Sequence, residues 1–279
     1  TLQDVSRTSA PLPQVATGNL DALHAYATGM KAYGDRRFSD SMTYFEQAAR
    51  FDPSFAFAYV GQMRVFYGRG DNTNSRKMLD KAISLKGRLA PRDALYLDAW
   101  GAELNGLGVS ESAAKWKLLA DLYPDYHGAH ANRAFALFSM GYYAESEAAA
   151  SRAAVSQNPL FSIALQQKAR AQLARGQVSA SLRSFQTAAD ADGGVQREHA
   201  AALSADDQFD AAWTLLDRLP ADSMAAWMTK VSVAVDQGDM PKAMELVSTA
   251  SALCRAHDHI CNVFRVQRLS LETLSAAAP

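Results

Sequence analysis

The stretch RRFSDSMTYFEQAARFDP (36–53) decides the fold of this 279-residue chain. After a turn, it places the small Ser41, the bulky Phe45 four positions later and the small Ala48 three positions after that. Residues at i, i+4 and i+7 share one face of a helix, so this spacing predicts a helix with a small-large-small stripe. The same pattern returns in GQVSASLRSFQTAADAD (176–192) and GDMPKAMELVSTASAL (238–253).

The first small residue of this stripe marks a repeat that can be followed along most of the chain. The marks are Ser41, Ser75, Ser112, Ser146, Ser181, Ala212 and Ala243, at intervals of 34, 37, 34, 35, 31 and 31 residues. An apolar segment of helical periodicity precedes each mark, and a short turn rich in Gly, Asp or Asn joins the two segments. Residues 19–253 are therefore predicted to form seven helix pairs.

This pattern resembles the tetratricopeptide repeat, a family with a period of 34 residues, small residues where helices cross and a closing proline. Pro53, Pro124, Pro159 and Pro220 stand at closing positions. In the second unit Gly87 replaces the proline, and KGRLA (86–90) lengthens the junction. The resemblance implies an all-α right-handed solenoid, in which the first helix of each pair lines a concave groove and the second forms the convex back.

The two ends of the chain fall outside the repeats. Residues 1–18 contain A-P-L-P and are interpreted as an extended linker from an upstream domain, since the sequence opens with Thr1 rather than Met. Residues 254–279 are expected to form a capping helix and a tail. Ile260, Val263, Phe264, Leu271 and Leu274 recur there at helical spacing, and a solenoid needs such a cap over its last repeat.

Composition supports the helical fold and excludes several functions. The chain has 53 Ala against 3 Ile and 14 Val, which favours helices over strands. A formal charge of −1 lacks the basic excess that nucleic-acid or anionic-membrane binding requires. No segment approaches 18 consecutive apolar residues, and no signal peptide is visible. Because phosphate-loop, dinucleotide, zinc-protease and nucleophile-elbow motifs are absent, we expect neither an enzyme nor a cofactor.

The first helices offer a candidate surface for a protein or peptide. Counting back from each mark to the groove-facing positions of the family gives a stripe rich in aromatic residues and arginine, the residues that dominate binding hot spots. An extended or helical peptide with apolar side chains and a carboxylate would suit this surface. The candidate groove residues are Tyr26, Met30, Tyr33, Phe57, Arg64, Tyr67, Leu97, Phe135, Phe138 and Arg170. The alternative is that some of these rings pack between helices.

One subgroup of the family clamps a C-terminal carboxylate of heat-shock chaperones with Lys and Asn on its first helices. Here Tyr26 and Met30 occupy those places. The clamp is missing, so chaperone tails are not the expected ligand.

The segment CRAHDHIC (254–261) is the sharpest local cluster. Cys254, His257, His259 and Cys261 are residue types that bind zinc, but their spacing matches no zinc finger. Three interpretations stay open: packing thiols with solvent-facing histidines, a Cys254–Cys261 disulfide made by a turn at His257-Asp258, and a zinc site. The disulfide would imply an oxidising compartment. His127 and His130, three residues apart, lack an evident third ligand and are expected to pack or face solvent.

The stretch from Thr8 to Tyr59 is similar to the start of the repeat region in bacterial multidomain signalling proteins, most of all the cyclase-like proteins of peptide-modification systems. LKGRLAPRDALYLDAW (85–100) resembles their lengthened second junction. The resemblance implies a sensory or scaffolding module beside an upstream catalytic or DNA-binding domain, with the periplasm favoured over the cytoplasm. The alternative is a self-association module that forms a homodimer by burying the alanine-rich face of residues 148–154.

Overall fold

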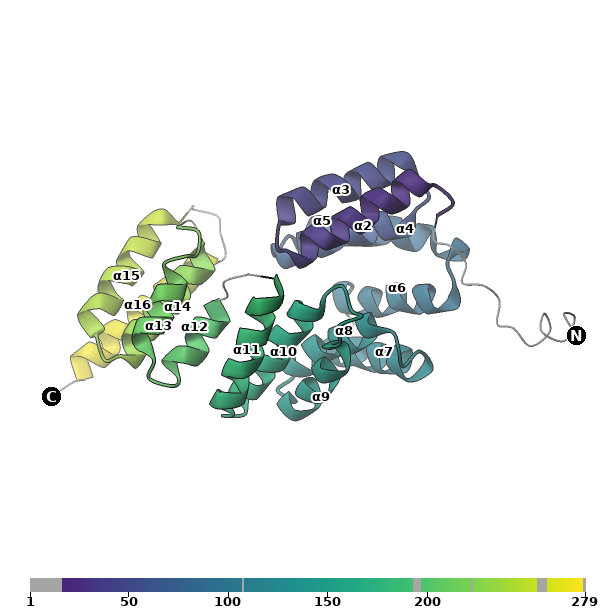
Figure 1. Cartoon of the computed structure of the whole chain (residues 1–279). Helices are drawn as coiled ribbons and strands as arrows, with labels where there is room; N and C mark the ends of the chain where they lie inside the picture. Colours follow the sequence, from purple (N-terminus) through teal and green to yellow (C-terminus); the bar gives the residue numbers. More distant parts are fainter. Residues whose placement is uncertain (1–16, 107, 193–196, 222, 255–259, 278–279) are drawn as a thin grey trace, which may run out of the picture. The chain divides into compact units, whose positions relative to one another are not determined.

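The computed structural model describes residues 17–277 apart from 107, 193–196, 222 and 255–259, and within these residues all regular structure is helical (Figure 1). The expected linker, 1–18, lies almost wholly outside the described residues. The helices are α2 (Leu20–Gly34), α3 (Phe38–Phe51), α4 (Ala56–Gly68), α5 (Asn72–Ser84), α6 (Pro91–Leu104), α7 (Val109–Leu122), α8 (His127–Ser139), α9 (Tyr143–Ala153), α10 (Phe161–Ala174), α11 (Val178–Asp192), α12 (Arg197–Ser204), α13 (Phe209–Leu216), α14 (Met224–Asp236), α15 (Met240–Leu253) and α16 (Ile260–Ala277), with a 3₁₀ turn η1 (Lys86–Arg88).

These helices follow one another as seven pairs, from α2 and α3 to α14 and α15, and α16 comes last. The prediction of an all-α repeat fold with seven helix pairs is confirmed. The lengthened junction of the second unit contains η1. The chain divides into two compact units, Thr1–Ala164 and Leu165–Pro279, with the boundary inside α10.

Short polar side chains and glycines set the ends of the helices. The side-chain oxygen of Asp71 accepts a hydrogen bond from the Asn74 backbone N–H at 3.0 Å, and Asp239 accepts from Lys242 at 3.0 Å. Such caps satisfy amides that have no partner inside the helix. Gly70, with φ of 76°, makes the turn before α5 in the left-handed region that favours glycine.

The serines that mark the repeat lie where two helices of a pair cross. Ser75, Ser146 and Ser181 are fully buried, and each Oγ donates to the backbone carbonyl twelve positions earlier on the first helix of its pair. The acceptors are Met63 (3.2 Å), Ala134 (2.8 Å) and Ala169 (2.8 Å). A serine therefore permits close approach of the two helices and satisfies its own buried hydroxyl.

The bulky residue of the stripe fills the space beside the crossing. Phe45 is fully buried in the first unit, and Gly29 of α2 and Gly61 of α4 lie against its ring. A Cβ atom on Gly61 would stand 2.5 Å from that ring, and one on Gly29 would stand 2.7 Å from it. Both glycines are therefore required for the close packing of α2, α3 and α4.

The second unit ends with α16 packed on α15. Phe264 and Leu271 of α16 are buried in the same apolar cluster as Val231 of α14 and Val247 of α15. Phe264 and Leu271 thus act as the buried face of the terminal helix (yellow in Figure 1). Among the described helices, none combines the length and the apolar character that crossing a bilayer requires.

Candidate functional site

Arg64 of α4 lies between the neighbouring first helices of the first unit. Its Nη1 lies 3.5 Å from the sulfur of Met30 on α2, and its Nη2 donates to the phenol oxygen of Tyr96 on α6. The guanidinium carbon lies 5.5 Å from the centre of the Tyr96 ring. Arg64 therefore joins three consecutive first helices, α2, α4 and α6.

Three further tyrosines surround this cation. Tyr26 and Tyr33 of α2 and Tyr126, just before α8, interact electrostatically with Arg64, and the Tyr126 ring lies 5.8 Å from that of Tyr96. We call Arg64, Met30, Tyr26, Tyr33, Tyr96 and Tyr126 the Arg64 cluster.

Three tyrosines of the cluster, Tyr26, Tyr33 and Tyr126, keep their phenol protons at physiological pH. Burial raises the pKa of Tyr26 to about 12, and it also raises the pKa values of Tyr33 and Tyr126. Burial opposes the charge of Arg64, but the surrounding phenol oxygens hold the pKa of its guanidinium above the usual range. Arg64 is therefore a permanent cation beside the neutral phenols of Tyr26, Tyr33 and Tyr126.

The buried carboxylate of this region forms an ion pair with a different arginine. Asp93 of α6 is 4% exposed, and its carboxylate lies 2.9 Å from the Nε of Arg92. Arg92 in turn lies over the ring of Tyr126, with its guanidinium carbon 4.8 Å from the ring centre. Within the described residues Arg64 makes no ion pair, so its positive charge is not neutralised by a carboxylate.

Aromatic packing connects the cluster to the core. The Tyr26 ring contacts Phe45, Phe55 and Phe57, with ring centres 5.6, 5.2 and 6.2 Å apart. Phe57 also contacts Tyr96 at 6.1 Å. Rings that pack in this way restrict one another's movement, so they hold the polar atoms of the cluster in fixed positions.

The structure places the predicted groove residues in several environments. It brings Tyr26, Met30, Tyr33, Phe57 and Arg64 together at or beside the cluster. Tyr67, near the end of α4, is 39% exposed and stacks edge-on against Trp100 at 5.2 Å.

Three of the predicted groove residues lie apart from the cluster. Phe135 on α8 is exposed, and Phe138 packs against Tyr143 at 5.2 Å. Arg170 belongs to the second unit, where burial lowers the pKa of its guanidinium.

The prediction that Leu97 lines the groove is wrong, because Leu97 is fully buried in the core and cannot contact a partner. Tyr96, one position earlier, contacts Arg64 instead. The error has a structural cause: α2, α4 and α8 end seven residues before their marks, whereas α6 ends at Leu104, eight residues before Ser112. Counting back from Ser112 is therefore wrong by one residue, and the extra residue in the sequence between α6 and α7 is the signal that could have shown it.

Part of the surface expected to mediate self-association is buried within the chain. Ala149, Ala150 and Ala153 of α9 are buried within the first unit, with 4%, 0% and 0% exposure. They pack inside the chain and are not available to a second copy. Ala148 keeps an exposed position.

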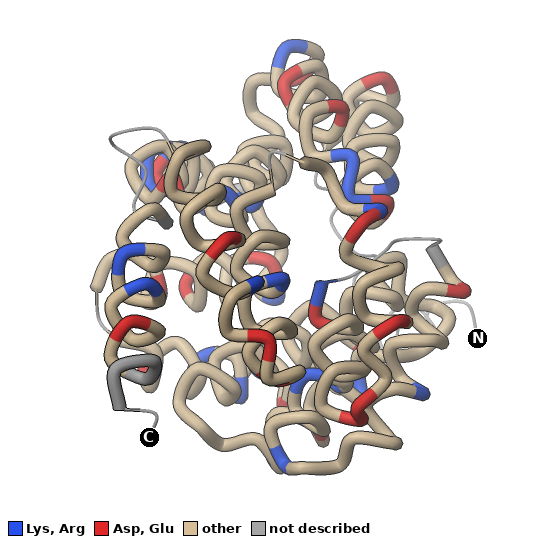
Figure 2. Tube along the Cα trace, turned by 90° about the vertical axis from the view of Figure 1, so that its left-hand side faces the viewer, with Lys and Arg blue, Asp and Glu red and all other residues tan. Residues whose placement is uncertain are grey.

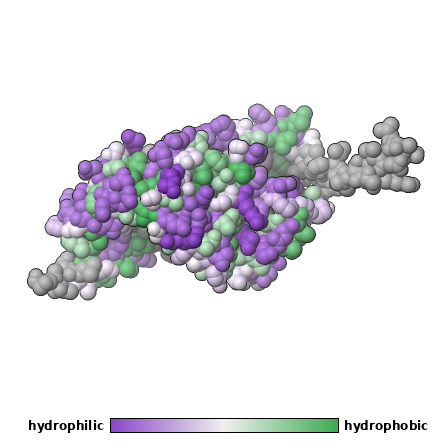
Figure 3. Space-filling model, turned by 60° about the horizontal axis from the view of Figure 1, so that its bottom comes forward, coloured by the Kyte–Doolittle hydropathy of each residue, from purple (hydrophilic) through white to green (hydrophobic). Residues whose placement is uncertain are grey.

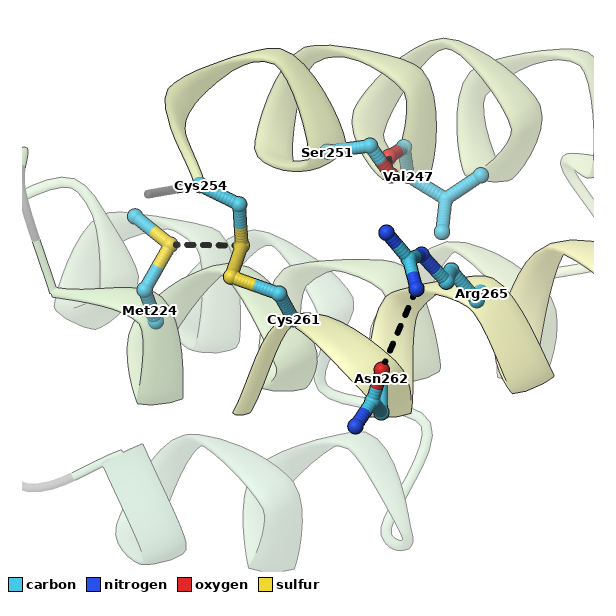
Figure 4. Close-up of a disulfide and its surroundings, with 7 residues drawn as sticks. All are labelled: Met224, Val247, Ser251, Cys254, Cys261, Asn262 and Arg265. Atoms are coloured by element: carbon cyan, nitrogen blue, oxygen red, sulfur yellow. Dashed lines mark hydrogen bonds between the residues drawn. A yellow bond between two sulfur atoms is a disulfide. The ribbon is translucent and has the colours of Figure 1, made fainter. Parts of the chain in front are cut away.

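Cys254 and Cys261 form a disulfide between the end of α15 and the first turn of α16 (Figure 4). The Cys254 sulfur lies 3.9 Å from the sulfur of Met224, at the start of α14. His257 and His259 lie outside the described residues. With both sulfur atoms bonded to each other, neither cysteine can bind zinc as a thiolate. Within the described residues, no three or more His, Cys, Asp or Glu side chains come together in a way that could hold a metal ion.

His127 and His130 border a second surface feature of the first unit, a cavity of about 540 Å³. The cavity is lined by Pro124, Asp125, His127, His130, Arg152, Val155 and Gln157. His130 is 2% exposed, and its Nε2–H donates to the Pro124 carbonyl at 2.7 Å. Burial lowers the pKa of His130, so this imidazole is a neutral packing group.

Comparison with known proteins defines the fold. No protein-family model and no curated protein sequence matches the chain. A tetratricopeptide repeat protein from Parabacteroides merdae superposes with a TM-score of 0.54 at 12% identity, covering 90% of this chain and 99% of that structure. Yeast Tom70 superposes with a TM-score of 0.52 at 14% identity, covering 99% of this chain and 58% of that protein. At these identities the likeness establishes the architecture, which is that of tetratricopeptide repeat solenoids.

Proposed function

We propose that this chain is a protein- or peptide-binding repeat module that recognises its partner through the surface of α2, α4 and α6. The observation that carries the proposal is the Arg64 cluster, which collects one unneutralised cation and several aromatic rings from consecutive first helices. Arginine and tyrosine are the residues most enriched in binding hot spots, because they combine a large contact area with hydrogen bonding. The repeat fold supports the proposal because it supplies an extended surface.

The distribution of charge favours a protein partner over nucleic acid. Figure 2 shows Lys and Arg interspersed with Asp and Glu along the chain, whose formal net charge is −1. On the face drawn in Figure 3, apolar side chains form small patches between polar ones. Recognition through a few anchoring rings and one cation fits such a surface better than a broad apolar interface does.

The wider context is part of the same proposal. We infer that the module is the sensory or scaffolding part of a larger bacterial signalling protein, and that its partner biases one curvature of the repeat array. The Cys254–Cys261 disulfide supports an oxidising compartment such as the periplasm. The catalytic step of such a protein would belong to a different domain.

A selection experiment tests the proposal. Random twelve-residue peptides displayed on phage are selected on the whole chain, and the affinity of enriched peptides is measured by fluorescence anisotropy. A Tyr33→Ala, Tyr67→Ala variant should bind them at least tenfold more weakly. Its matched control, Phe51→Ala with Tyr142→Ala, removes two aromatic rings at exposed positions of α3 and the α8–α9 turn and should bind like the wild type.

Circular dichroism confirms that both variants are folded. Equal loss of affinity in the two variants, or enrichment of no peptide, would contradict the proposal. Self-association is measured on the same samples by sedimentation velocity. A concentration-dependent dimer that forms without peptide and is lost in the Tyr33→Ala, Tyr67→Ala variant would favour the alternative.

A further inference from the structure

We propose that the cavity bordered by His127 and His130 is a binding site for a small zwitterion, namely a free α-amino acid with an uncharged side chain. Its volume of about 540 Å³ lies in the range of small-molecule sites in proteins. Its walls come from the α7–α8 turn, the start of α8, the end of α9 and the turn after α9, all within the first unit. None of the lining residues belongs to the Arg64 cluster, so this is a second site, independent of the proposed peptide-binding surface.

The cavity presents one permanent charge of each sign, and the chain pairs neither of them. Arg152, in the last turn of α9, and Asp125, in the turn before α8, are exposed and line the same cavity. Within the described residues, neither side chain forms an ion pair or a hydrogen bond. Arg152 also acts electrostatically on Asp121, but the carboxylate of Asp121 is already bonded to Lys117. A guanidinium and a carboxylate are therefore both accessible to a ligand.

A zwitterion satisfies these two groups together. Although Arg152 and Asp125 share a cavity, they are not in ion-pair contact with each other, which leaves room for a ligand between them. The carboxylate of an amino acid matches the planar fork of the Arg152 guanidinium. Its ammonium group supplies N–H donors for the oxygen atoms of Asp125. Hydrogen bonds between ionised partners are the strong ones, so both ends of the ligand contribute.

The inner wall of the cavity contains buried ring nitrogens that lack a partner. Nδ1 of His127 and Nδ1 of His130 are buried and make no hydrogen bond within the described residues. The Nε2–H of His130 donates to the Pro124 carbonyl, and burial lowers the pKa of this imidazole, so its Nδ1 carries a lone pair. Buried polar atoms are ordinarily hydrogen-bonded, and a ligand with N–H groups offers the kind of donor that this nitrogen lacks.

The remaining lining selects among ligand classes. Apart from Arg152 and Asp125, none of the described lining residues is Lys, Arg, Asp or Glu. A phosphate or a polyamine would leave charge unmatched, whereas an amino acid with an uncharged side chain balances one cation and one acid. Pro124 and Val155 supply apolar contacts for that side chain.

Ligand binding to the whole chain tests the inference. Saturation-transfer NMR screens the proteinogenic L-amino acids with uncharged side chains one at a time, and isothermal titration calorimetry measures the affinity of the strongest binder. Two analogues are titrated beside it: its carboxamide, which lacks the negative charge, and its deamino acid, which lacks the ammonium group. We expect each analogue to bind about tenfold more weakly, because each loses one charged hydrogen-bonding partner.

Variants at exposed positions locate the site. Arg152→Gln should weaken binding of the amino acid about tenfold and leave the carboxamide unaffected, whereas Asp125→Asn should weaken the amino acid about tenfold and leave the deamino acid unaffected. The matched controls are Arg50→Gln, an exposed arginine in the last turn of α3, and Asp80→Asn, an exposed acid of α5. Both controls should bind like the wild type, and circular dichroism checks that all four variants are folded.

Equal affinity for the amino acid and its two analogues, or binding of no amino acid, overturns the zwitterion site. Wild-type affinity in Arg152→Gln and Asp125→Asn overturns the assignment to this cavity, as does an equal loss in the controls. The selection of peptides on the surface of α2, α4 and α6 is a separate measurement, so failure here leaves the proposed function standing.

Discussion

The phenol hydroxyl of Tyr67 on α4 donates to a carboxylate oxygen of Glu103 on α6 at 2.6 Å. The other oxygen of Glu103 accepts from the hydroxyl of Ser112 on α7 at 2.8 Å. Glu103 therefore connects a first helix, its neighbour and the serine that marks the third repeat. Burial, followed by the negative charge and hydrogen bond of Glu103, raises the pKa of Tyr67 well above its usual value. The hydroxyl remains a donor throughout the neutral range.

Tyr67→Phe removes this donor and keeps the ring that contacts Trp100. We expect the free energy of unfolding to fall by about 1 kcal/mol, because the lost bond has a charged acceptor but is partly exposed. Urea denaturation at neutral pH measures the change. Tyr142→Phe is the matched control, since Tyr142 is exposed on the turn before α9 and should be neutral. Equal stability of the two variants would show that the Glu103 contact contributes nothing.

Gly61→Ala tests the packing around Phe45. The added Cβ would stand 2.5 Å from the Phe45 ring, and overpacking of this kind costs about 1–3 kcal/mol. Gly68→Ala in the same helix is the control: a Cβ there meets nothing within 4 Å, so the higher helix propensity of alanine should stabilise the chain by up to about 1 kcal/mol. Thermal unfolding compares the two, and a smaller ring in Phe45→Leu should rescue Gly61→Ala.

Replacing the disulfide by Cys254→Ser with Cys261→Ser should loosen α16. The bond closes a short loop of sequence separation seven, so its loss is expected to cost about 2 kcal/mol. Amide hydrogen exchange of residues 261–271 measures the docking of α16, and it should quicken while exchange in α2–α9 stays unchanged. A wild-type sample treated with a thiol reductant should match the variant. Unchanged exchange in α16 would mean that Phe264 and Leu271 hold the helix alone.

His130 should make the first unit less stable in mild acid. Burial lowers its pKa below the ordinary value of about 6.5, so below that pH the unfolded chain binds a proton that the folded chain does not. Its contribution to stability is full above pH 6.5 and is lost as the pH falls towards the folded pKa.

In His130→Gln this contribution disappears, so the variant should lose less stability than the wild type between pH 7.5 and pH 5.5 in urea denaturation. His24→Gln, at an exposed position of α2, should retain the wild-type dependence. His199 in the second unit has its pKa lowered by burial too, and it contributes equally to both variants. Identical pH dependence in His130→Gln and wild type would assign the acid sensitivity elsewhere.

The fold was predictable because the repeat signal is local and redundant. The small-large-small stripe of Ser41, Phe45 and Ala48 describes one helix face, and all three residues are fully buried. The signal reappears six times, so an irregular unit does not obscure it. The glycines opposite Phe45 needed the structure, since a close approach depends on which helix packs against which ring.

The candidate site was only partly predictable, because it depends on register between units. Met30, Arg64 and Tyr33 were found because α2 and α4 keep a constant distance to their marks. Tyr96 was missed because the turn after α6 is one residue longer. Tyr126 lies outside a helix, at the N-cap of α8, where counting helix positions says nothing about it. The neutralisation of Arg92 by Asp93, which leaves Arg64 as the unmatched cation, is a tertiary property.

The hydrogen bonds from the marking serines to carbonyls twelve positions earlier have a consequence for how the chain folds. Ser75, Ser146 and Ser181 each join two helices through a short closed loop, so every such pair can form before distant parts of the chain meet. Folding can then begin at any of these hairpins and spread to its neighbours. During synthesis, each such helix pair can therefore fold once it has left the ribosome, before the last residue of the chain has been made.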